Sequence, residues 1–400
     1  MKFAHLADCH VGGWREPKMR EANNQAFLKS INHCLKERVD FVLISGDLFN
    51  TAVPAIDSLK LVVKKLKELK DNQIPVYVVA GSHDYSASGK TMLDVLESAG
   101  LVTNVAKDEE LPNNSVRLKL TTDQKTGAKI TGFAGKKGGL EQNRLLQVEK
   151  EQAEKGYKIF MFHTTLAELK PQELDKVEAI SATVLPEGFD YYAGGHVHIA
   201  DKAVIGNRNI VYPGPTFPNN FAELEKLKKG SFVIVEDGKI EHVEIETFPV
   251  QSIVVEAEDK SPTEVEQELE KEIQKINAKD SIVTIRINGC LRTGKPSDIR
   301  FQELLTQLHE KGAYFIMKNT YALKTKELEE VSISSTNVEE LEAELIKKHA
   351  GQKPLQNLEE DIQLTKKLMQ TLMTEKAEGE RVPDFETRIF QETDDALEAK

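Results

Sequence analysis

The residues that could carry chemistry are aspartates and histidines at five places in the first 200 positions, each close behind a short apolar run. They are Asp8 and His10, Asp47, His83 and Asp84, His163, and His196 and His198. One histidine in such a place is usually an ordinary polar residue, but five of the ten histidines of the chain lie there. Carboxylate and imidazole groups together suit manganese, iron or zinc better than calcium or magnesium. This set therefore predicts a metal centre.

The spacing inside the set indicates how the side chains would converge. Asp8 and His10 are two residues apart, as are His196 and His198, so on an extended segment both members of a pair would point to the same side. A glycine directly precedes Asp47 and would let the backbone turn sharply there. Two metal ions about 3.5–4 Å apart can clamp the attacking and leaving oxygens of a phosphoryl group. The set therefore favours phosphoryl-transfer chemistry.

Five apolar runs position these residues, and each predicts a buried strand. The runs are KFAHLA, DFVLISG, IPVYVVAG, YKIFMFH and FDYYAGG. Helical apolar spacing lies between them, over Asp57–Lys70 and Thr91–Ala99, which predicts a sheet covered on both faces by helices. Weaker alternation over residues 115–133, 202–212 and 231–245 predicts additional antiparallel strands. Because the carboxyl ends of the strands in such a layered fold converge on one edge, we expect the five clusters to meet there.

The chain beyond residue 249 predicts a smaller domain and a helical tail. Residues 250–332 alternate strand and helix patterns in the order β-α-β-α-β, which is enough for a small two-layer domain. Residues 337–378 hold two amphipathic helices, which are too small to form a good core alone and must either dock on a partner or pack on the body of the chain. Residues 379–400 form an acidic tail that we expect to fray and stay flexible.

Composition limits the classes of protein to which the chain can belong. Four hundred residues predict two to three domains. The net charge of −12 argues against wrapping by nucleic acid and against membrane attachment through overall charge. Most of the acidity lies in residues 337–400, which hold 16 acidic and 9 basic residues, so an anionic substrate at the nearly neutral body stays open. Three scattered cysteines form no disulfide framework. We recognise neither a signal peptide nor a membrane span and expect a cytoplasmic protein.

The motifs around these residues resemble those of a known superfamily. D-x-H, G-D-x-x-[HN], G-[NS]-H-D, a lone histidine and G-H-x-H follow one another in a way that is similar to calcineurin-like metallophosphoesterases. More closely, HLADCHVG, GDLFN, YAGGHVH and YPGP resemble the SbcD-type nuclease subunit of the complex that repairs DNA double-strand breaks. The motifs cover about residues 1–220. The resemblance implies a sandwich of two sheets covered by helices over residues 1–249 and a DNA-entry cap over residues 250–332. It also implies that the helices of residues 337–378 dock on an SMC-like ATPase.

The resemblance also implies a role for each residue of the set. Two divalent metal ions, with manganese favoured, would be held by Asp8, His10, Asp47 and His198 and by Asp47, His163 and His196, with Asp47 as the bridge. His83 would act as the acid or electrostatic stabiliser at the leaving oxygen, held in orientation by Asp84. Two positions depart from the family pattern. Ser82 stands where asparagine is the usual fourth ligand of the second metal, and Asn50 stands at a substrate-side position that is often histidine.

DNA is the substrate that the resemblance implies, cut by an exonuclease or endonuclease reaction. Candidate phosphate contacts are Arg15, Lys136 and Lys137, with Lys18, Arg20, Lys226, Lys228 and Lys229 as further basic candidates. A homodimer is also implied, and the helices at 57–70 and 91–99 could either supply its contact or pack on the core. Two other functions stay open. One is a metallophosphatase acting on small phosphate esters or phosphoproteins, and the other is a DNA-binding scaffold whose metal site is weakened by Ser82.

Overall fold

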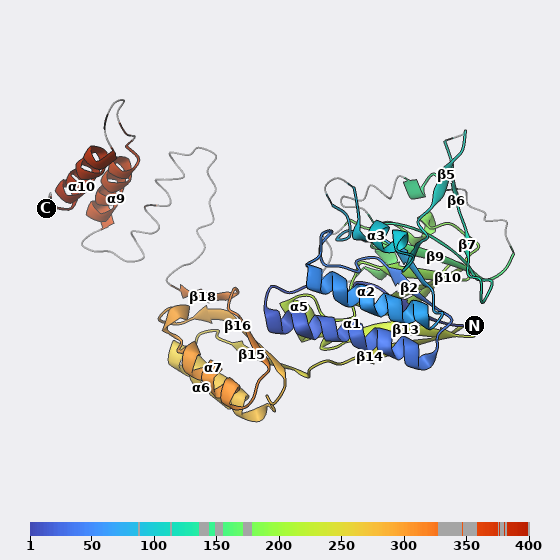
Figure 1. Ribbon diagram of the computed structural model, residues 1–400. Helices are drawn as coiled ribbons and strands as arrows, with labels where there is room; N and C mark the ends of the chain where they lie inside the picture. Colours follow the sequence, from blue (N-terminus) through green and yellow to red (C-terminus); the bar gives the residue numbers. More distant parts are fainter. Residues whose placement is uncertain are drawn as a thin grey trace. The chain divides into compact units, whose positions relative to one another are not determined.

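The computed structural model describes the chain apart from residues 87–88, 113, 136–143, 149–154, 171–177, 327–345, 347–357, 375, 377–379, 381 and 399–400 (Figure 1). The chain divides into two compact units. The first consists of Met1–Val255, Gln267–Arg286 and Arg300–Asn319, and the second of Glu256–Glu266, Ile287–Ile299 and Thr320–Lys400. Among the described helices, none is both long and apolar enough to cross a membrane.

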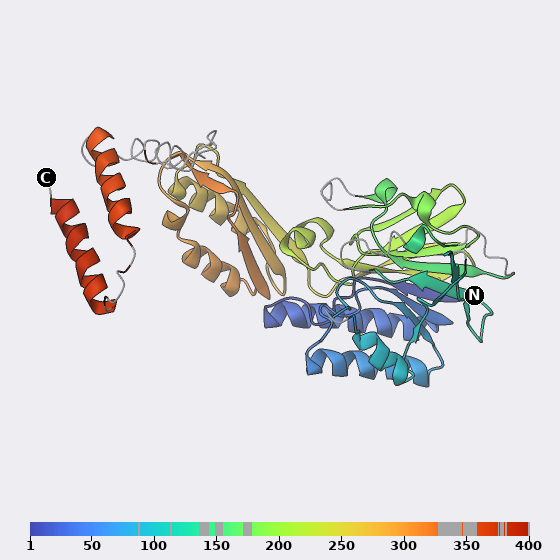
Figure 2. The ribbon, with the colours of Figure 1, turned by 90° about the horizontal axis from the view of Figure 1, so that it is seen from above.

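The first sheet contains three of the five predicted strands. Its order is β14-β13-β1-β2-β3-β4, in which β1 to β4 are parallel and β13 and β14 form an antiparallel hairpin beside β1. The strands are β1 (Lys2–Leu6), β2 (Phe41–Ser45), β3 (Val76–Val79), β4 (Thr103–Asn104), β13 (Gly230–Glu236) and β14 (Lys239–Ile245). The parallel strands are connected by α1 (Pro17–Glu37), α2 (Ile56–Asp71) and α3 (Met92–Ser98). Figure 2 shows α1 and α2, in blue, together on one face of this sheet.

The second sheet contains the other two predicted strands. Its order is β11-β12-β10-β9-β8-β7, with β8, β9, β10 and β12 parallel and β7 and β11 antiparallel at the edges. The strands are β7 (Thr121–Thr122), β8 (Lys129–Phe133), β9 (Lys158–His163), β10 (Tyr191–Gly195), β11 (Ala200–Ile205) and β12 (Arg208–Pro213). A separate hairpin joins β5 (Asp108–Glu110) to β6 (Val116–Leu118). Short 3-10 helices lie at Ala167–Leu169 and Ala182–Val184, and α5 (Phe221–Leu227) follows β12.

The two sheets pack face to face through one buried apolar cluster. Phe3, Phe41 and Tyr77 of the first sheet meet Met161 and Tyr191 of the second in this cluster. The predicted two-sheet α/β sandwich is therefore confirmed. The expectation of one sheet with helices on both faces is wrong, because the inner face of each sheet is covered by the other sheet.

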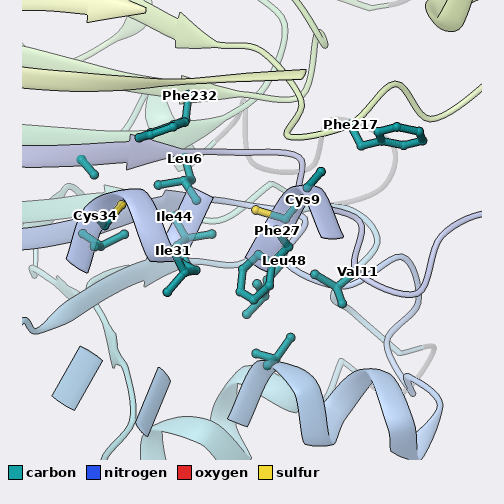
Figure 3. Packing of buried hydrophobic residues seen from close by; sticks show 14 of the residues in the cluster. Leu6, Cys9, Val11, Phe27, Ile31, Cys34, Ile44, Leu48, Phe217 and Phe232 are labelled. Carbon is teal, nitrogen blue, oxygen red and sulfur yellow. The ribbon is translucent and has the colours of Figure 1, made fainter. Parts of the chain in front are cut away.

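A second buried cluster anchors the first sheet to its helices and reaches the residues beside the predicted metal ligands (Figure 3). Phe27 and Ile31 of α1 pack in it with Ile44 of β2. Cys9, between Asp8 and His10, is fully buried in the same cluster, and Leu48, next to Asp47, is 1% exposed. Burying an aliphatic or aromatic side chain of this size contributes about 1.5–3 kcal/mol. The core thus holds the backbone of two ligand-bearing loops in place.

The predicted β-α-β-α-β order appears after residue 249. The elements are β15 (Val250–Glu256), α6 (Pro262–Lys275), β16 (Ile282–Leu291), α7 (Phe301–Glu310), β17 (Phe315–Asn319) and β18 (Leu323–Thr325), with a 3-10 helix at Pro296–Asp298. The sheet order is β15-β16-β17, with β18 also paired to β16. The domain limits 1–249 and 250–332 stay a prediction, because the two compact units each take part of residues 250–332.

Within its described residues, the tail contains two helices, α9 (Leu358–Leu372) and α10 (Val382–Glu398), which lie side by side in Figures 1 and 2. The expectation that residues 379–400 fray is wrong for α10. Phe385, Ile389 and Ala396 recur at helical spacing, and all three are at least partly buried, so a side of α10 is covered in spite of its acidic composition. Most of the shorter helix predicted before Gly351 lies outside the described residues.

Candidate metal centre

The predicted residues meet at the carboxyl ends of the strands of both sheets. Three groups of side chains have ligand atoms that all lie within 4.8 Å of one another. The groups are Asp8, His10 and His198; His10, Asp47 and His83; and Asp47, His163 and His196. His10 and Asp47 each belong to two groups, so the three groups form one continuous cluster. The sequence placed these seven residues within one site, and the structure brings them together.

Asp47 lies at the middle of the cluster. Its Oδ2 atom is 3.2 Å from Nε2 of His163 and 3.8 Å from Nε2 of His10. On the far side of His10, the Nε2 atoms of His10 and His198 are 3.0 Å apart, and Nε2 of His198 is 3.7 Å from Oδ1 of Asp8. One carboxylate therefore faces histidines that come from both sheets, which is the position that a bridging ligand needs.

The donor set fits divalent cations. Nδ1 of His10 and Nε2 of His163 are buried and make no hydrogen bond, although Nε2 of His163 lies beside Oδ2 of Asp47 as an ion pair. Leaving a buried polar atom unpaired is costly, and two imidazole Nε2 atoms that face each other at 3.0 Å cannot both be donors or both be acceptors without a third group. Imidazole nitrogens and carboxylate oxygens are the ligands that manganese, iron and zinc take. Asp8, His10 and His198 would hold one ion, His163 and His196 would hold another, and Asp47 would be shared by both.

The buried charges depend strongly on one another. Burial raises the pKa of Asp8, and the neighbouring His198 and His163 oppose that change. Burial alone would also raise the pKa of Asp47, but His163 and His10 outweigh it and hold the pKa well below its usual range. Conversely, burial would lower the pKa of His163, yet Asp47 and Asp8 raise it to about 10. Positive charge is therefore favoured between the two carboxylates, which is what a divalent cation would supply.

Five of the seven cluster residues have a left-handed backbone. The φ angles are 50° for Asp8, 42° for His10, 50° for Asp47, 102° for His196 and 50° for His198. The expectation that each pair lies on an extended segment is therefore wrong. A non-glycine residue in this region costs about 1–3 kcal/mol and persists only where its surroundings enforce it. For Asp8, His10 and Asp47, the buried Cys9 and Leu48 and a hydrogen bond of 2.9 Å from the His10 N–H to the Asp47 carbonyl do so.

Two glycines leave room for the cluster. A Cβ atom on Gly46 would collide with the ring of His163, and Gly46 also has a φ of 88°. A Cβ atom on Gly81 would collide with the carboxylate of Asp47. These close approaches explain why glycine precedes the ligand at one position and the Ser82–His83 pair at the other.

His83 lies at the exposed side of the cluster. Its Nδ1 atom donates to the main-chain carbonyl of Asn50 at 2.9 Å, and the main-chain N–H of His83 donates to Oδ1 of Asp47 at 2.8 Å. Asp84 instead accepts from the N–H groups of Gly81 and Phe49 at 2.9 and 3.2 Å. Asp84 thus has no described hydrogen bond to the ring of His83, and its expected role in holding His83 in orientation stays a prediction that would act through the backbone. Asp84 fixes the backbone of the loop, and burial together with the charge of Asp47 raises its pKa to about 7.

The other predicted residues, Ser82 and the basic candidates, do not belong to the seven-residue cluster. Ser82 is partly exposed beside His83, and its role as a ligand stays a prediction. The side chain of Arg15 is exposed, whereas the Lys18 ammonium donates to the carbonyl of Tyr314 at 3.0 Å and the Lys229 ammonium to Glu244 at 2.9 Å. Arg20 donates to the carbonyls of Trp14 and Arg15. Lys136 and Lys137 lie outside the described residues.

One residue of the site escaped the sequence reasoning. Oε1 of Glu223 lies 3.0 Å from Nδ1 of His198. Glu223 is in α5, 25 residues after His198 along the chain, and it does not follow an apolar run. Its only sequence signal is Asn220 three residues earlier, which resembles a helix-capping pair.

The chain is similar in sequence to a known family and to known proteins. A family model described as calcineurin-like phosphoesterase matches residues 1–200. The DNA double-strand break repair protein Mre11 of Archaeoglobus fulgidus is 28% identical over 341 residues, which cover 78% of this chain and 76% of that protein. The protein of the same name from Methanopyrus kandleri is 29% identical over 301 residues, 70% of this chain and 65% of its own. A solved dimetal phosphatase from Danio rerio covers 62% of this chain and 97% of its own, with 9% identity and a TM-score of 0.38.

The match spans the five strand ends that carry the cluster, those of β1, β2, β3, β9 and β10. The seven clustered side chains, from Asp8 to His198, all fall inside the matched residues 1–200. The chain therefore belongs to the calcineurin-like phosphoesterase family of metal-dependent phosphoesterases.

Proposed function

We propose that this chain is a two-metal DNA nuclease that hydrolyses phosphodiester bonds at DNA ends during double-strand-break repair. The observation that carries the proposal is the continuous cluster in which Asp47 faces His10 on one side and His163 on the other. The similarity to two proteins named for DNA double-strand break repair supports DNA as the substrate. The mixture of imidazole nitrogen and carboxylate oxygen suits manganese, iron and zinc, and we propose manganese because the resemblance to SbcD-type nucleases implies it.

The residues of the chain divide the work between binding and proton transfer. When bound, two divalent ions supply positive charge to the phosphoryl oxygens and make water acidic enough to react near neutral pH. His83 lies at the exposed side of the cluster with its Nδ1 atom engaged by the carbonyl of Asn50. This leaves Nε2 to donate a proton to, or stabilise charge on, the leaving oxygen. Asp84 keeps the loop that carries His83 in its shape through Gly81 and Phe49.

Ser82, Asn50, Arg15, Lys136 and Lys137 keep their proposed places around this centre. We propose Ser82 as a weak neutral ligand of the second ion and the others as contacts to DNA. If Ser82 stands in for a stronger amide ligand, Ser82→Asn should leave nuclease activity intact or raise it. A complete loss of activity in that variant would contradict the ligand assignment.

Partners are also proposed. Leu372 in α9 and Phe390 in α10 are exposed by 65% and 74%, and Met373, directly after α9, is exposed by 69%; exposed large apolar side chains are common at interaction surfaces. We propose that they dock on an SMC-like ATPase. Near α2 and α3, Val53, Ile56 and Val95 are exposed by 76%, 82% and 57%, which favours a homodimer. Sedimentation should show a dimer that Ile56→Glu dissociates.

The substrate is tested with the purified chain and manganese. Linear DNA and a small phosphate monoester are offered in parallel to the wild type and to His83→Ala. Cleavage of DNA that His83→Ala loses supports the nuclease. Turnover of the monoester alone supports the alternative, a metallophosphatase for small phosphate esters or phosphoproteins. DNA binding with no cleavage of either substrate supports the other alternative, a scaffold with a weakened metal site.

A further inference from the structure

A carboxylate outside the predicted ligand set holds one of the clustered histidines. Oε1 of Glu223 accepts a hydrogen bond from Nδ1 of His198 at 3.0 Å. The Nε2 atom at the opposite end of that ring faces the cluster, 3.0 Å from Nε2 of His10 and 3.7 Å from Oδ1 of Asp8. The His198 ring is thus hydrogen-bonded through Nδ1, while its Nε2 atom points towards the metal centre.

Glu223 is itself fixed in position. Its Oε2 atom accepts from the main-chain N–H of Asn219 at 2.7 Å, and Oε1 also accepts from the side-chain amide of Asn220. The Oδ1 atom of Asn220 in turn accepts from the N–H of Glu223 at 2.9 Å. The next residue of α5, Leu224, is fully buried in the core. Both oxygens of the carboxylate are therefore engaged, and the carboxylate has little freedom to follow His198 if the ring rotates.

The chemical consequence concerns the tautomer of His198. A neutral imidazole carries one proton, and a carboxylate at Nδ1 keeps that proton on Nδ1. The lone pair then lies on Nε2, the nitrogen that faces Asp8 and His10. In metal sites a carboxylate at the second ring nitrogen fixes the orientation of the histidine and makes it a better donor.

We propose that Glu223 is a positioning residue that holds His198 in the tautomer and orientation needed to bind one of the two metal ions. The proposal rests on the metal centre of the proposed function. It is specific for one ion, because His198 groups with Asp8 and His10, whereas Asp47, His163 and His196 form a separate group. Glu223 contacts no member of that second group among its described hydrogen bonds.

The competing explanation is that Glu223 only stabilises the first turn of α5. The hydrogen bonds of Glu223 with Asn219 and Asn220 would then hold the shape of this turn and would have no effect on the metal centre. The two roles differ in what a neutral substitute would change. Glu223→Gln can accept from only one of its two terminal atoms, so it cannot serve both His198 and the N–H of Asn219, and it carries no charge for the His198 ring.

The test is a titration of the full apoprotein with manganese, monitored by calorimetry and by electron paramagnetic resonance. The thermal unfolding of each variant is measured in parallel. Glu225→Gln is the matched control. Glu225 lies in the same helix, but its carboxylate accepts from Arg286 at 2.9 Å rather than from His198. We expect Glu223→Gln to lower the affinity for one of the two manganese ions by about 10–100-fold and to leave the affinity for the other unchanged. Glu225→Gln should leave both unchanged.

The outcomes separate this inference from the function on which it rests. A wild type that binds no manganese overturns the metal centre itself. A wild type that binds two ions, with a Glu223→Gln variant that binds both as tightly, overturns only the role of Glu223. Equal weakening of both ions, together with a melting temperature below that of Glu225→Gln, shows that Glu223 only stabilises α5 and also overturns it.

A second measurement needs no variant, in case Glu223→Gln does not fold. Nitrogen-15 resonances of the histidines in the wild-type apoprotein, recorded at a pH where the His198 ring is neutral, report which ring nitrogen carries the proton. The inference requires the proton on Nδ1 of His198. A proton on Nε2 would rule it out.

Discussion

Asp47 and His163 come from different sheets, and their side chains meet with Oδ2 of the aspartate 3.2 Å from Nε2 of the histidine. Asp47 follows β2 in the first sheet, and His163 is the last residue of β9 in the second. The contact therefore requires the two sheets to be packed in their correct alignment. This makes Asp47 the residue whose charge both halves of the sandwich share.

The first prediction concerns that shared charge. Asp47→Asn keeps the size of the side chain but removes the charge that faces His10 and His163, so the two proposed ion sites lose the carboxylate that they would share. We expect manganese affinity and nuclease activity each to fall by at least about 100-fold, measured by calorimetry and by DNA cleavage. Asp123→Asn is the control, since Asp123 is an equally buried carboxylate that accepts from Tyr77 away from the cluster. Unchanged metal binding in Asp47→Asn would refute the bridging role.

The second prediction separates a main-chain contact from a side-chain contact. The carbonyl of Asn50 holds Nδ1 of His83, and a carbonyl is present whatever residue occupies position 50. We therefore expect Asn50→Ala, which removes a proposed contact to DNA, to raise the KM for DNA but to keep kcat within about threefold, whereas His83→Ala should lower kcat by about 100-fold to 10,000-fold, the range of a lost general acid. Both variants should bind manganese like the wild type. Equal losses in the two variants would show that the side chain of Asn50 has a role of its own.

Much of this site could be predicted from sequence, because its ligands follow buried strands. Asp8, Asp47 and His163 are found by reading each apolar run to its end, and a strand end is where a parallel sheet delivers side chains to an edge. The features that the sequence did not reveal are contacts that form only when the folded chain brings particular groups together. Glu223 reaches His198 from a helix that no strand pattern marks, and Asp84 turns away from its chain neighbour His83 to bind the backbone.

The left-handed backbone of the ligand loops was also not predicted. Nothing in the residue types of Asp8 or His10 demands a positive φ, and the core around Cys9 imposes it. The helix α10 was missed for a different reason. Its net charge dominated the interpretation of residues 379–400, although Phe385, Ile389 and Ala396 have the spacing of an amphipathic helix.

The third prediction concerns the pH dependence of stability. His5 is fully buried, with Nδ1 3.0 Å from the hydroxyl of Tyr191. Burial, reinforced by His242, lowers the pKa of His5 to about 3. The unfolded chain takes up this proton near pH 6.5, so the folded state loses stability as the pH falls from about 6.5 towards 3. Between about pH 7.5 and pH 5.5 this one residue should cost about 1.4 kcal/mol.

The measurement compares the wild type with His5→Gln, which does not titrate. Urea unfolding of both proteins is followed at the two pH values with a chelator present, so that metal binding does not contribute. The wild type should lose about 1.4 kcal/mol more than the variant on acidification. Parallel losses would show that His5 takes up its proton equally in the folded and unfolded states.

The fourth prediction concerns the tail. Phe390 is 74% exposed on α10, whereas Ala396 of the same helix is 3% exposed, so Phe390 does not hold the two tail helices together. If this side is the docking surface for the ATPase, Phe390→Glu should leave the helical circular dichroism unchanged and weaken binding of the ATPase by at least about tenfold, as the loss of a central aromatic anchor does. DNA cleavage by the chain alone should not change.

Gln391→Glu provides the control for added charge. Gln391 is an exposed neighbour on the same helix, so this variant adds the same negative charge without removing an aromatic ring. It should bind the ATPase like the wild type. If Phe390→Glu also bound with wild-type affinity, the exposed apolar residues of α10 would not be the docking surface. If both variants bound weakly to the same extent, the net charge of the tail rather than the aromatic ring would govern the interaction.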